Sequence, residues 1–219
     1  MPIASVPFTF ILAPHYHPCL APIAPYRKSL PFRTLFNMIG PLINPARPRG
    51  MVLGVAERQL GHPFAQSLRD GGVVRALVVC GVEGLDEISC AGDTWAWSLA
   101  PDGTITETVL HPAQFGLGTH PLAAVSSGRA AENAVTLTRL LTPGGEGLED
   151  EGLRPVLDFV LLNAAALLVV AGVAADYRDG VRLARESIKS GAAWRALEMF
   201  REAGRAAMAS VPAGPAQGN

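Results

Sequence analysis

Two adjacent carboxylates, Asp86 and Glu87, lie in a glycine-flanked turn that follows the most apolar segment of the chain, residues 74–80. A continuous apolar run of this length is typical of a parallel strand covered on both faces. In open α/β sheets, ligands bind beyond the carboxyl ends of such strands. Mg²⁺ binds proteins through one or two carboxylates together with water and substrate phosphates. The pair is therefore a candidate magnesium site, although a solvated acidic turn is the simpler interpretation of the dipeptide by itself.

A second group of polar side chains lies near the amino terminus, in a loop bounded by prolines. His15 and His17 are two residues apart, but no third ligand stands at a spacing that zinc sites use. Arg27 follows ten residues later and offers a planar guanidinium that can bind a carboxylate through charge-assisted hydrogen bonds. An ordinary exposed arginine is the alternative. The segment 36–45 alternates apolar residues with Gly-Pro and Asn-Pro pairs, and it is interpreted from its pattern as a tight connector with buried flanks.

The periodicity of the chain predicts elements that would position these residues. Alternating apolar residues predict a strand at 8–12, and short apolar runs predict strands at 51–55 and 74–80, with a helix at 57–71 between the last two. A Pro-Asp-Gly turn predicts a hairpin of residues 94–99 and 104–110. Helical spacing then predicts four helices, at residues 130–141, 155–173, 176–190 and 192–203.

These elements predict an α/β fold with a central, mostly parallel sheet, flanking helices and an inserted β-hairpin. We expect one domain at residues 8–203 and a disordered tail at 204–219, where alanine, proline and glycine dominate from Ser210 onward. The glycine-rich, acidic insert at 143–152 is expected to be a solvent loop. The apolar stretch at 156–173 contains Asp158 and Asn163, so a buried core helix explains it better than a membrane span.

Composition excludes several classes of function. The 219 residues are 49% hydrophobic and 17% charged, with 18 basic and 19 acidic side chains and a net charge of −1. Neither a nucleic-acid groove nor a membrane-surface patch is expected from this balance. The three cysteines are an odd number without metal-ligand spacing, and Cys80 lies inside an apolar run, where a buried thiol is expected. The cysteine usage favours a reducing compartment, and we expect a cytoplasmic protein.

Several segments, taken together and in order, resemble the anthranilate phosphoribosyltransferase family, which also holds pyrimidine nucleoside phosphorylases. Each segment alone is weakly specific, but their order and spacing cover the chain from about residue 8 to residue 203. The segments are 10–18, 24–28, 33–46, 84–89, 131–134, 162–166 and 184–192.

The resemblance implies transfer of ribose 5-phosphate from phosphoribosyl pyrophosphate to the amine of anthranilate, in tryptophan biosynthesis, with Mg²⁺. By position, Asp86 and Glu87 match the family's metal ligands and Arg27 matches the arginine that binds the anthranilate carboxylate. Four further residues match the lining of the anthranilate site, namely Pro41 in the channel and Ala13, Pro14 and His17 in the neighbouring loop. The implied binding partners are these two substrates. The resemblance also implies that the full-length form is a homodimer.

The chain also departs from the family pattern. Family members carry an N-terminal helical segment, a Gly-Thr-Gly-Gly-Asp loop, an Asn-x-Ser-Thr segment and a Lys-His-Gly-Asn segment, and none of these motifs occurs in the sequence. Because these motifs cradle the pyrophosphate, we expect an incomplete enzyme that binds phosphoribosyl pyrophosphate poorly. Two alternatives remain, a non-catalytic binding or scaffold remnant of the fold and a pyrimidine nucleoside phosphorylase-like enzyme.

Overall fold

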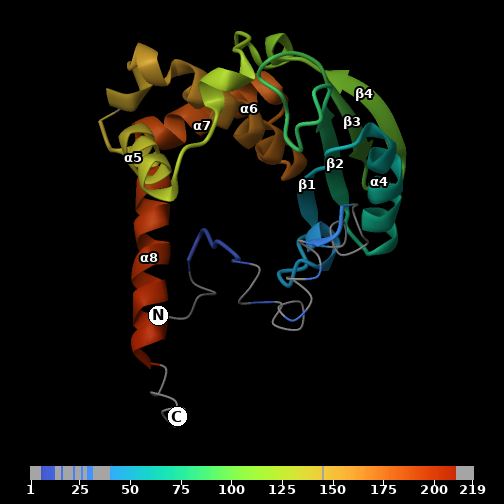
Figure 1. Ribbon diagram of the computed structural model, residues 1–219, viewed down its shortest axis with the longest axis horizontal. Helices are drawn as coiled ribbons and strands as arrows, with labels where there is room; N and C mark the ends of the chain where they lie inside the picture. Colours follow the sequence, from blue (N-terminus) through green and yellow to red (C-terminus); the bar gives the residue numbers. More distant parts are fainter. Residues whose placement is uncertain are drawn as a thin grey trace.

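The computed structural model describes residues 6–12, 16, 22, 26, 29–31, 40–144 and 146–210. Within this part of the chain a four-stranded sheet has the order β1-β2-β3-β4 (Figure 1). The strands are β1 (Gly50–Gly54), β2 (Arg75–Gly81), β3 (Thr94–Leu99) and β4 (Ile105–Leu110).

The predicted α/β class with flanking helices is confirmed, but the sheet over the described residues is mixed rather than mostly parallel. Strands β1 and β2 are parallel, whereas β3 is antiparallel to both β2 and β4. The reason is that the predicted hairpin extends the sheet instead of standing apart from it. Its first strand pairs with β2 along six residues, from Ala76 opposite Leu99 to Gly81 opposite Thr94.

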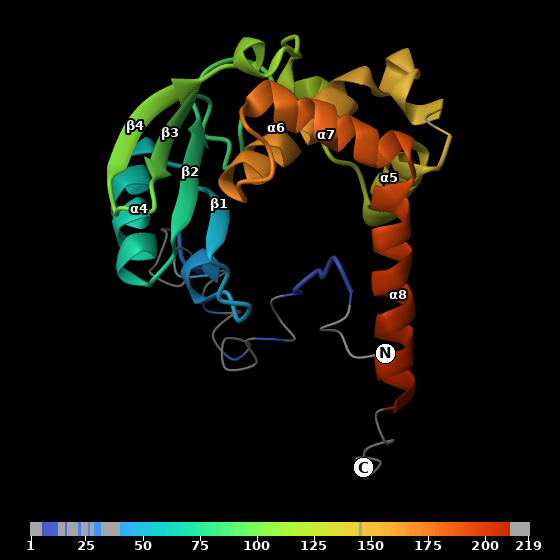
Figure 2. The same cartoon turned by 180° about the vertical axis from the view of Figure 1, so that it is seen from behind.

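Helix α4 (Gly61–Asp70) connects the two parallel strands and covers one face of the sheet, after a short 3-10 turn, η4 (Arg58–Leu60). Its apolar side chains at helical spacing, Phe64, Ala65 and Leu68, are buried against Val78 and Trp97 of the sheet. The predicted strand–helix–strand unit is therefore confirmed. Figure 2 shows α4 on the outer face of the sheet, opposite α6 and α7.

The other face of the sheet is covered by helices from the second half of the chain. Helix α6 packs on β1 and β2, and α7 packs on α6. Leu157, Leu161 and Leu162 of α6 are fully buried beside Leu77 and Val79 of β2. The longer helices here are α5 (Ala130–Leu141), α6 (Arg154–Val170), α7 (Tyr177–Lys189) and α8 (Ala192–Ser210).

Short 3-10 turns complete the described part of the fold. They are η3 (Gly40–Ile43), η5 (Pro112–Phe115), η6 (Leu122–Val125), η7 (Glu146–Leu148) and η8 (Glu151–Leu153). The last two lie within the predicted solvent loop at 143–152 and its end. That prediction is corrected in part, because Leu148 is buried in the core.

One segment, Glu151–Val170, is long and apolar enough to cross a membrane by length and composition. The structure supports the predicted core helix instead, because one side of α6 is buried between the sheet and α7. Asp158 is only 3% exposed and its carboxylate is paired with Arg154 and hydrogen-bonded to His120.

Two predictions near the chain ends are corrected. Residues 8–12 form no strand, since none of the described strands pairs with them. Phe8 instead packs edge to face on Phe200 of α8, with 5.5 Å between ring centroids. Helix α8 continues to Ser210, so residues 204–210 of the predicted tail are helical, and it projects away from the sheet (Figure 1). Residues 211–219 lie outside the described residues.

Candidate functional site at the carboxyl end of the sheet

Asp86 and Glu87 lie in the loop that leaves the carboxyl end of β2, as the sequence predicted, and both side chains are exposed. Pro41 lies in η3, which precedes β1 and so lies toward the opposite end of the strands. The structure therefore does not bring Pro41 and the carboxylate pair together. The other predicted substrate-binding residues, Ala13, Pro14, His17 and Arg27, lie outside the described residues.

A tight glycine turn starts the carboxylate loop. The amide of Gly84 donates to the carbonyl of Gly81 at 2.9 Å, and the amide of Gly81 donates to the carbonyl of Leu85 at 2.8 Å. Gly84 has a φ of +82°, in the left-handed region that glycine adopts without steric cost. The chain thus reverses directly after the strand and leaves Asp86 at the edge of the sheet.

Strand β1 fixes the same loop from the side. Gly54, the last residue of β1, lies so close to the loop that a Cβ atom built on it would be 1.5 Å from the carbonyl oxygen of Asp86. Only glycine leaves room for this approach of two backbones. The position of Asp86 is therefore set by the sequence of the neighbouring strand.

The residues that follow the carboxylates are buried and hydrogen-bonded. Ser89 and Thr94 are fully buried, and the amide of Ser89 donates to Oγ1 of Thr94 at 2.9 Å. The hydroxyl of Ser89 donates to the carboxylate of Glu83 and accepts from the amide of Ala91 at 3.0 Å. Glu83 precedes Asp86 and Glu87 in the chain, and Ser89 follows them. The hydrogen bond between Ser89 and Glu83 therefore joins the two ends of the carboxylate loop.

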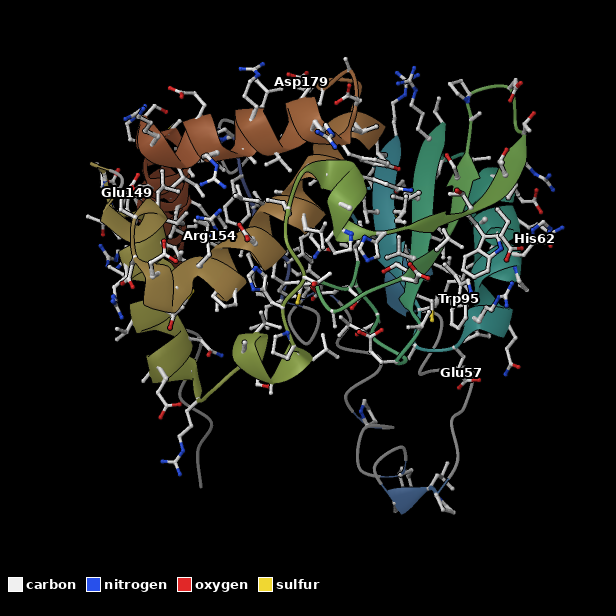
Figure 3. The ribbon with its side chains drawn as sticks, turned by 90° about the horizontal axis from the view of Figure 1, so that it is seen from above. Glu57, His62, Trp95, Glu149, Arg154 and Asp179 are labelled. Carbon is white, nitrogen blue, oxygen red and sulfur yellow. The ribbon has the colours of Figure 1, made fainter. Side chains whose placement is uncertain are left out.

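A buried acid joins the next segment to α6. The amide of His120 donates to the carbonyl of Cys90 at 2.8 Å, and its imidazole Nε2 lies 2.9 Å from Oδ2 of Asp158. Arg154 donates from Nε to the same oxygen at 3.2 Å, and a guanidinium nitrogen of Arg185 lies 3.9 Å from Oδ1. Asp158 is thus a buried carboxylate that lies beside one imidazole and two guanidinium groups. Figure 3 shows Arg154 on the side of the molecule opposite Trp95 and α4.

The electrostatics of the loop are acidic. Loss of hydration raises the pKa of Glu87, and the negative charge of Asp86 raises it further. Burial raises the pKa of the Cys80 thiol beneath the loop, and the charges of Glu83, Asp86 and Glu57 add to the effect in that order. Among the described residues, no ion pair involves Asp86 or Glu87.

The donor chemistry of the pair fits Mg²⁺. Both side chains offer only oxygen atoms as ligands, and both are exposed. Among the described residues, neither carboxylate forms an ion pair with a basic side chain that would compete with a metal cation. Within the same residues no group of three or more histidine, cysteine or acidic side chains could hold a metal ion, so the pair would need water and substrate oxygen atoms to complete the coordination. That pattern suits a cation that keeps most of its water and shares its remaining positions with substrate phosphates.

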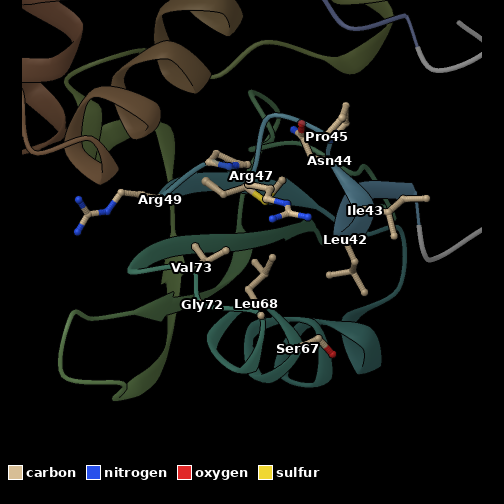
Figure 4. A pocket seen from close by; sticks show the side chains of 13 residues that line it. Leu42, Ile43, Asn44, Pro45, Arg47, Arg49, Ser67, Leu68, Gly72 and Val73 are labelled. Carbon is tan, nitrogen blue, oxygen red and sulfur yellow. The ribbon is translucent and has the colours of Figure 1, made fainter. Parts of the chain in front are cut away.

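A cavity lies elsewhere, at the amino end of the parallel strands. It has a volume of about 690 Å³ and is bounded by η3, the segment before β1 and the end of α4 (Figure 4). Arg47 and Arg49 contribute to its wall, but Arg49 points away from the other lining side chains in this view. The cavity and the carboxylate loop are therefore separate features at opposite ends of the sheet.

The fold is an α/β domain, with helices on both faces of one sheet and the carboxylate loop at the end of β2. The chain belongs to the glycosyl transferase family, and residues 2–194 match the a/b domain of that family. It is 48% identical to the anthranilate phosphoribosyltransferase of Schizosaccharomyces pombe over 193 residues, which cover 88% of this chain and 53% of that protein. It is 39% identical to the enzyme of the same name from Prochlorococcus marinus over 201 residues, covering 92% and 55%.

Solved structures give the same result. The anthranilate phosphoribosyltransferase of Saccharomyces cerevisiae in complex with 4-fluoroanthranilate superposes with a TM-score of 0.83 and 32% identity, over 92% of this chain and 56% of that one. The same enzyme in complex with PRPP and Mg superposes with a TM-score of 0.82 and 32% identity, again over 92% and 56%. The chain spans about half the length of the curated relatives it matches.

Sequence reasoning found the carboxylate pair but missed the residues that hold it. Glu83, Ser89 and Thr94 carried no recognisable spacing, because their hydrogen bonds depend on how the turn folds back on itself. Gly54 had a weak signal in the sequence, a glycine at the end of a strand. Such a position often marks a close approach of another backbone.

Proposed function

We propose that this chain is part of an anthranilate phosphoribosyltransferase, which transfers ribose 5-phosphate from phosphoribosyl pyrophosphate to anthranilate in tryptophan biosynthesis. The observation that carries the proposal is the 48% identity to a relative of that name along 88% of the chain. The motif residues Asp86 and Glu87 lie at a strand end, where this class of fold binds ligands.

In this reaction the amine nitrogen of anthranilate forms a bond to C1 of the ribose. The bond from C1 to the pyrophosphate oxygen breaks, and pyrophosphate leaves with the electron pair. The attacking amine loses a proton to the surrounding water. No covalent enzyme intermediate is required, so the protein acts by positioning the two substrates and by stabilising the charge of the leaving group.

Asp86 and Glu87 are the residues that would hold Mg²⁺ in this account. When bound, the cation supplies positive charge beside the departing pyrophosphate. The glycine turn and the bond between Glu83 and Ser89 keep the two carboxylates at the edge of the sheet, facing solvent. A saccharomycete relative that superposes on this chain was solved in complex with PRPP and Mg, which supports the choice of cation.

Arg27 would bind the carboxylate of anthranilate through its planar guanidinium. Pro41, Ala13, Pro14 and His17 would line the anthranilate site. We further propose a cytoplasmic enzyme that forms a homodimer in its full-length form and binds neither nucleic acid nor membranes. The near-neutral charge balance, 18 basic against 19 acidic side chains, supports the last point.

A chimera tests the proposal. Residues 1–219 replace the matching part of the Schizosaccharomyces pombe relative, so that the remaining sequence of that protein precedes them. We expect the chimera to consume anthranilate, seen as loss of its fluorescence, only when phosphoribosyl pyrophosphate and Mg²⁺ are both present. An Asp86→Asn, Glu87→Gln chimera should lose at least about tenfold in kcat/KM.

Two other results would contradict the proposal. A folded chimera without anthranilate turnover, judged against the intact relative, would favour a scaffold remnant. Release of thymine from thymidine and phosphate would favour a nucleoside phosphorylase. Within an active chimera, Arg27→Ala should raise KM for anthranilate more than KM for phosphoribosyl pyrophosphate. Equal changes in both would remove the role assigned to Arg27.

A further inference from the structure

A side chain from α6 forms hydrogen bonds with the backbone of the residue directly after the carboxylate pair. The amide of Ile88 donates to Oδ1 of Asn163 at 3.0 Å, and Nδ2 of Asn163 donates to the carbonyl of Ile88 at 3.2 Å. The same nitrogen donates to the carbonyl of Phe159, one turn earlier in α6, at 3.1 Å. Asn163 and Ile88 are 75 residues apart in the chain, so this is a tertiary contact.

Helix α6 itself gives no reason for an amide at this position. Asn163 lies in a run of apolar residues and is half-buried between the buried Leu162 and Ala166. A polar group there is unfavourable unless it is hydrogen-bonded. Its oxygen and its nitrogen both have partners, and two of the three bonds go to Ile88. Asn163 therefore makes most of its side-chain hydrogen bonds with the carboxylate loop rather than with its own helix.

The contact fixes the loop next to Glu87. Ile88 is the first fully buried residue after the pair, and its neighbour Glu87 is one peptide unit away, about 3.8 Å between Cα atoms. On the other side, Gly54 of β1 holds the backbone of Asp86. The two carboxylates thus lie between one fixed point on the sheet and one on α6.

We propose that Asn163 is a positioning residue for the cation site, one that sets the backbone of Ile88 and thereby the geometry of Asp86 and Glu87. The proposal rests on the proposed function in one respect, that these two carboxylates bind a divalent cation. Loss of the amide leaves both backbone groups of Ile88 without these partners, and the loop that carries the two carboxylates then samples more positions.

The chain contains a matched control. Asn133 of α5 makes the same pair of bonds to one residue, accepting from the amide of Gly128 at 2.9 Å and donating to its carbonyl at 3.1 Å. It lies in the first turn of α5, and both of these side-chain bonds go to Gly128, which precedes that helix, rather than to the carboxylate loop. Asn133→Ala therefore removes an equivalent interaction without changing the proposed site.

The test compares Asn163→Ala with Asn133→Ala in the purified 219-residue chain. Hydrogen exchange measured by mass spectrometry should accelerate at least about tenfold in residues 84–89 of Asn163→Ala and stay unchanged there in Asn133→Ala. Mn²⁺, used as the probe cation and titrated by water-proton relaxation, should bind about tenfold more weakly to Asn163→Ala only. Both measurements are made well below the unfolding temperature of each variant.

The outcomes separate the two claims. Wild-type exchange rates in residues 84–89 of Asn163→Ala overturn the positioning role, and so does wild-type Mn²⁺ affinity. If the wild-type chain does not bind Mn²⁺, the cation site of the proposed function fails, while the exchange data still decide the role of Asn163. If Asn163→Ala does not fold, Asn163→Asp is measured by exchange alone. That variant keeps the acceptor but not the donor, so an unchanged loop would again overturn the proposal.

Discussion

The two ends of the parallel strands are built differently. At the carboxyl end, the residues beside the carboxylate pair are fully buried and held by side chains from three elements. At the amino end, the cavity is lined by exposed or half-buried residues, with Leu68 as a buried exception. Arg47, in the wall of that cavity, has a φ of +45°, which non-glycine residues seldom adopt.

The difference shows which part of the proposed chemistry this chain arranges by itself. The carboxylates are positioned entirely by described residues, from β1, the loop itself and α6. The wall near η3 is supported by partial packing of Leu42 on the core and by backbone hydrogen bonds of Asn44 and Arg49. We therefore expect the residues that support the carboxylate loop to be sensitive to substitution, and Arg47, in the wall of the amino-end cavity, to tolerate it.

The largest effect should come from Gly54→Ala. The new methyl group collides with the backbone carbonyl of Asp86, which cannot move without releasing the loop. We expect a loss of about 3 kcal/mol in the free energy of unfolding, together with loss of Mn²⁺ binding. Urea unfolding and a Mn²⁺ titration measure the two effects.

Gly50→Ala is the matched control, because Gly50 begins the same strand and a Cβ there meets only ordinary contacts at 3.6 Å. It should change stability by less than about 0.5 kcal/mol and leave Mn²⁺ binding intact. Equal effects of the two substitutions would remove the distinction between the ends of β1.

Asp158→Asn should have the next largest effect. The substitution removes the buried charge that pairs with His120 and Arg154, and with it the link between Cys90 and α6. Because the side chains of His120 and Arg154 are both partly exposed, we expect a loss of about 2 kcal/mol rather than the larger cost of a fully buried pair. Urea unfolding of this variant beside Asp70→Asn, an exposed acid, measures the loss. A change below about 0.5 kcal/mol would show that the network is not a structural link.

Arg47→Gly tests the opposite end and should be neutral or stabilising. Glycine adopts the positive φ of this position without strain, so we expect a gain of up to about 1 kcal/mol. Arg49→Gly, at a position without positive φ, should instead lose up to about 1 kcal/mol. Thermal unfolding of the two variants decides between them, and a clear destabilisation by Arg47→Gly would indicate that the arginine has a structural role in the cavity wall.

The smallest effect concerns a surface pair outside both ends. A hydrogen bond from Arg58 at 2.9 Å lowers the pKa of Glu107 below its ordinary value. Since the pKa is lower in the folded state, the contribution to stability is present above the ordinary value and is lost as pH falls through the folded one. Stability of wild type and Glu107→Gln, measured from neutral to acid pH, should therefore converge in acid. A difference that does not vary with pH would contradict this.

The sequence predicted most of the fold because its signals are local. Strands β1 and β2, the hairpin and helices α4 to α7 follow from period and turn residues, and their bounds differ from prediction by a few residues. The strand at 8–12 failed since a strand also needs a partner, and no described strand pairs with it. The carboxylate pair was found from its place after a buried strand, whereas Asn163 was noted only as a polar interruption of an apolar helix. Its partner, Ile88, is 75 residues away in the chain, and patterns in a single sequence do not reveal contacts between residues so far apart.

The most direct test of the account is whether the carboxyl-end loop binds a divalent cation through Asp86 and Glu87. Mn²⁺ is titrated by water-proton relaxation into the purified chain, into Asp86→Asn and Glu87→Gln, and into Asp70→Asn at the amino end of the strands. We predict one site in the wild type and in Asp70→Asn, weakened at least about tenfold by either loop substitution. Binding that is equal in all four proteins, or absent from the wild type, would contradict the account.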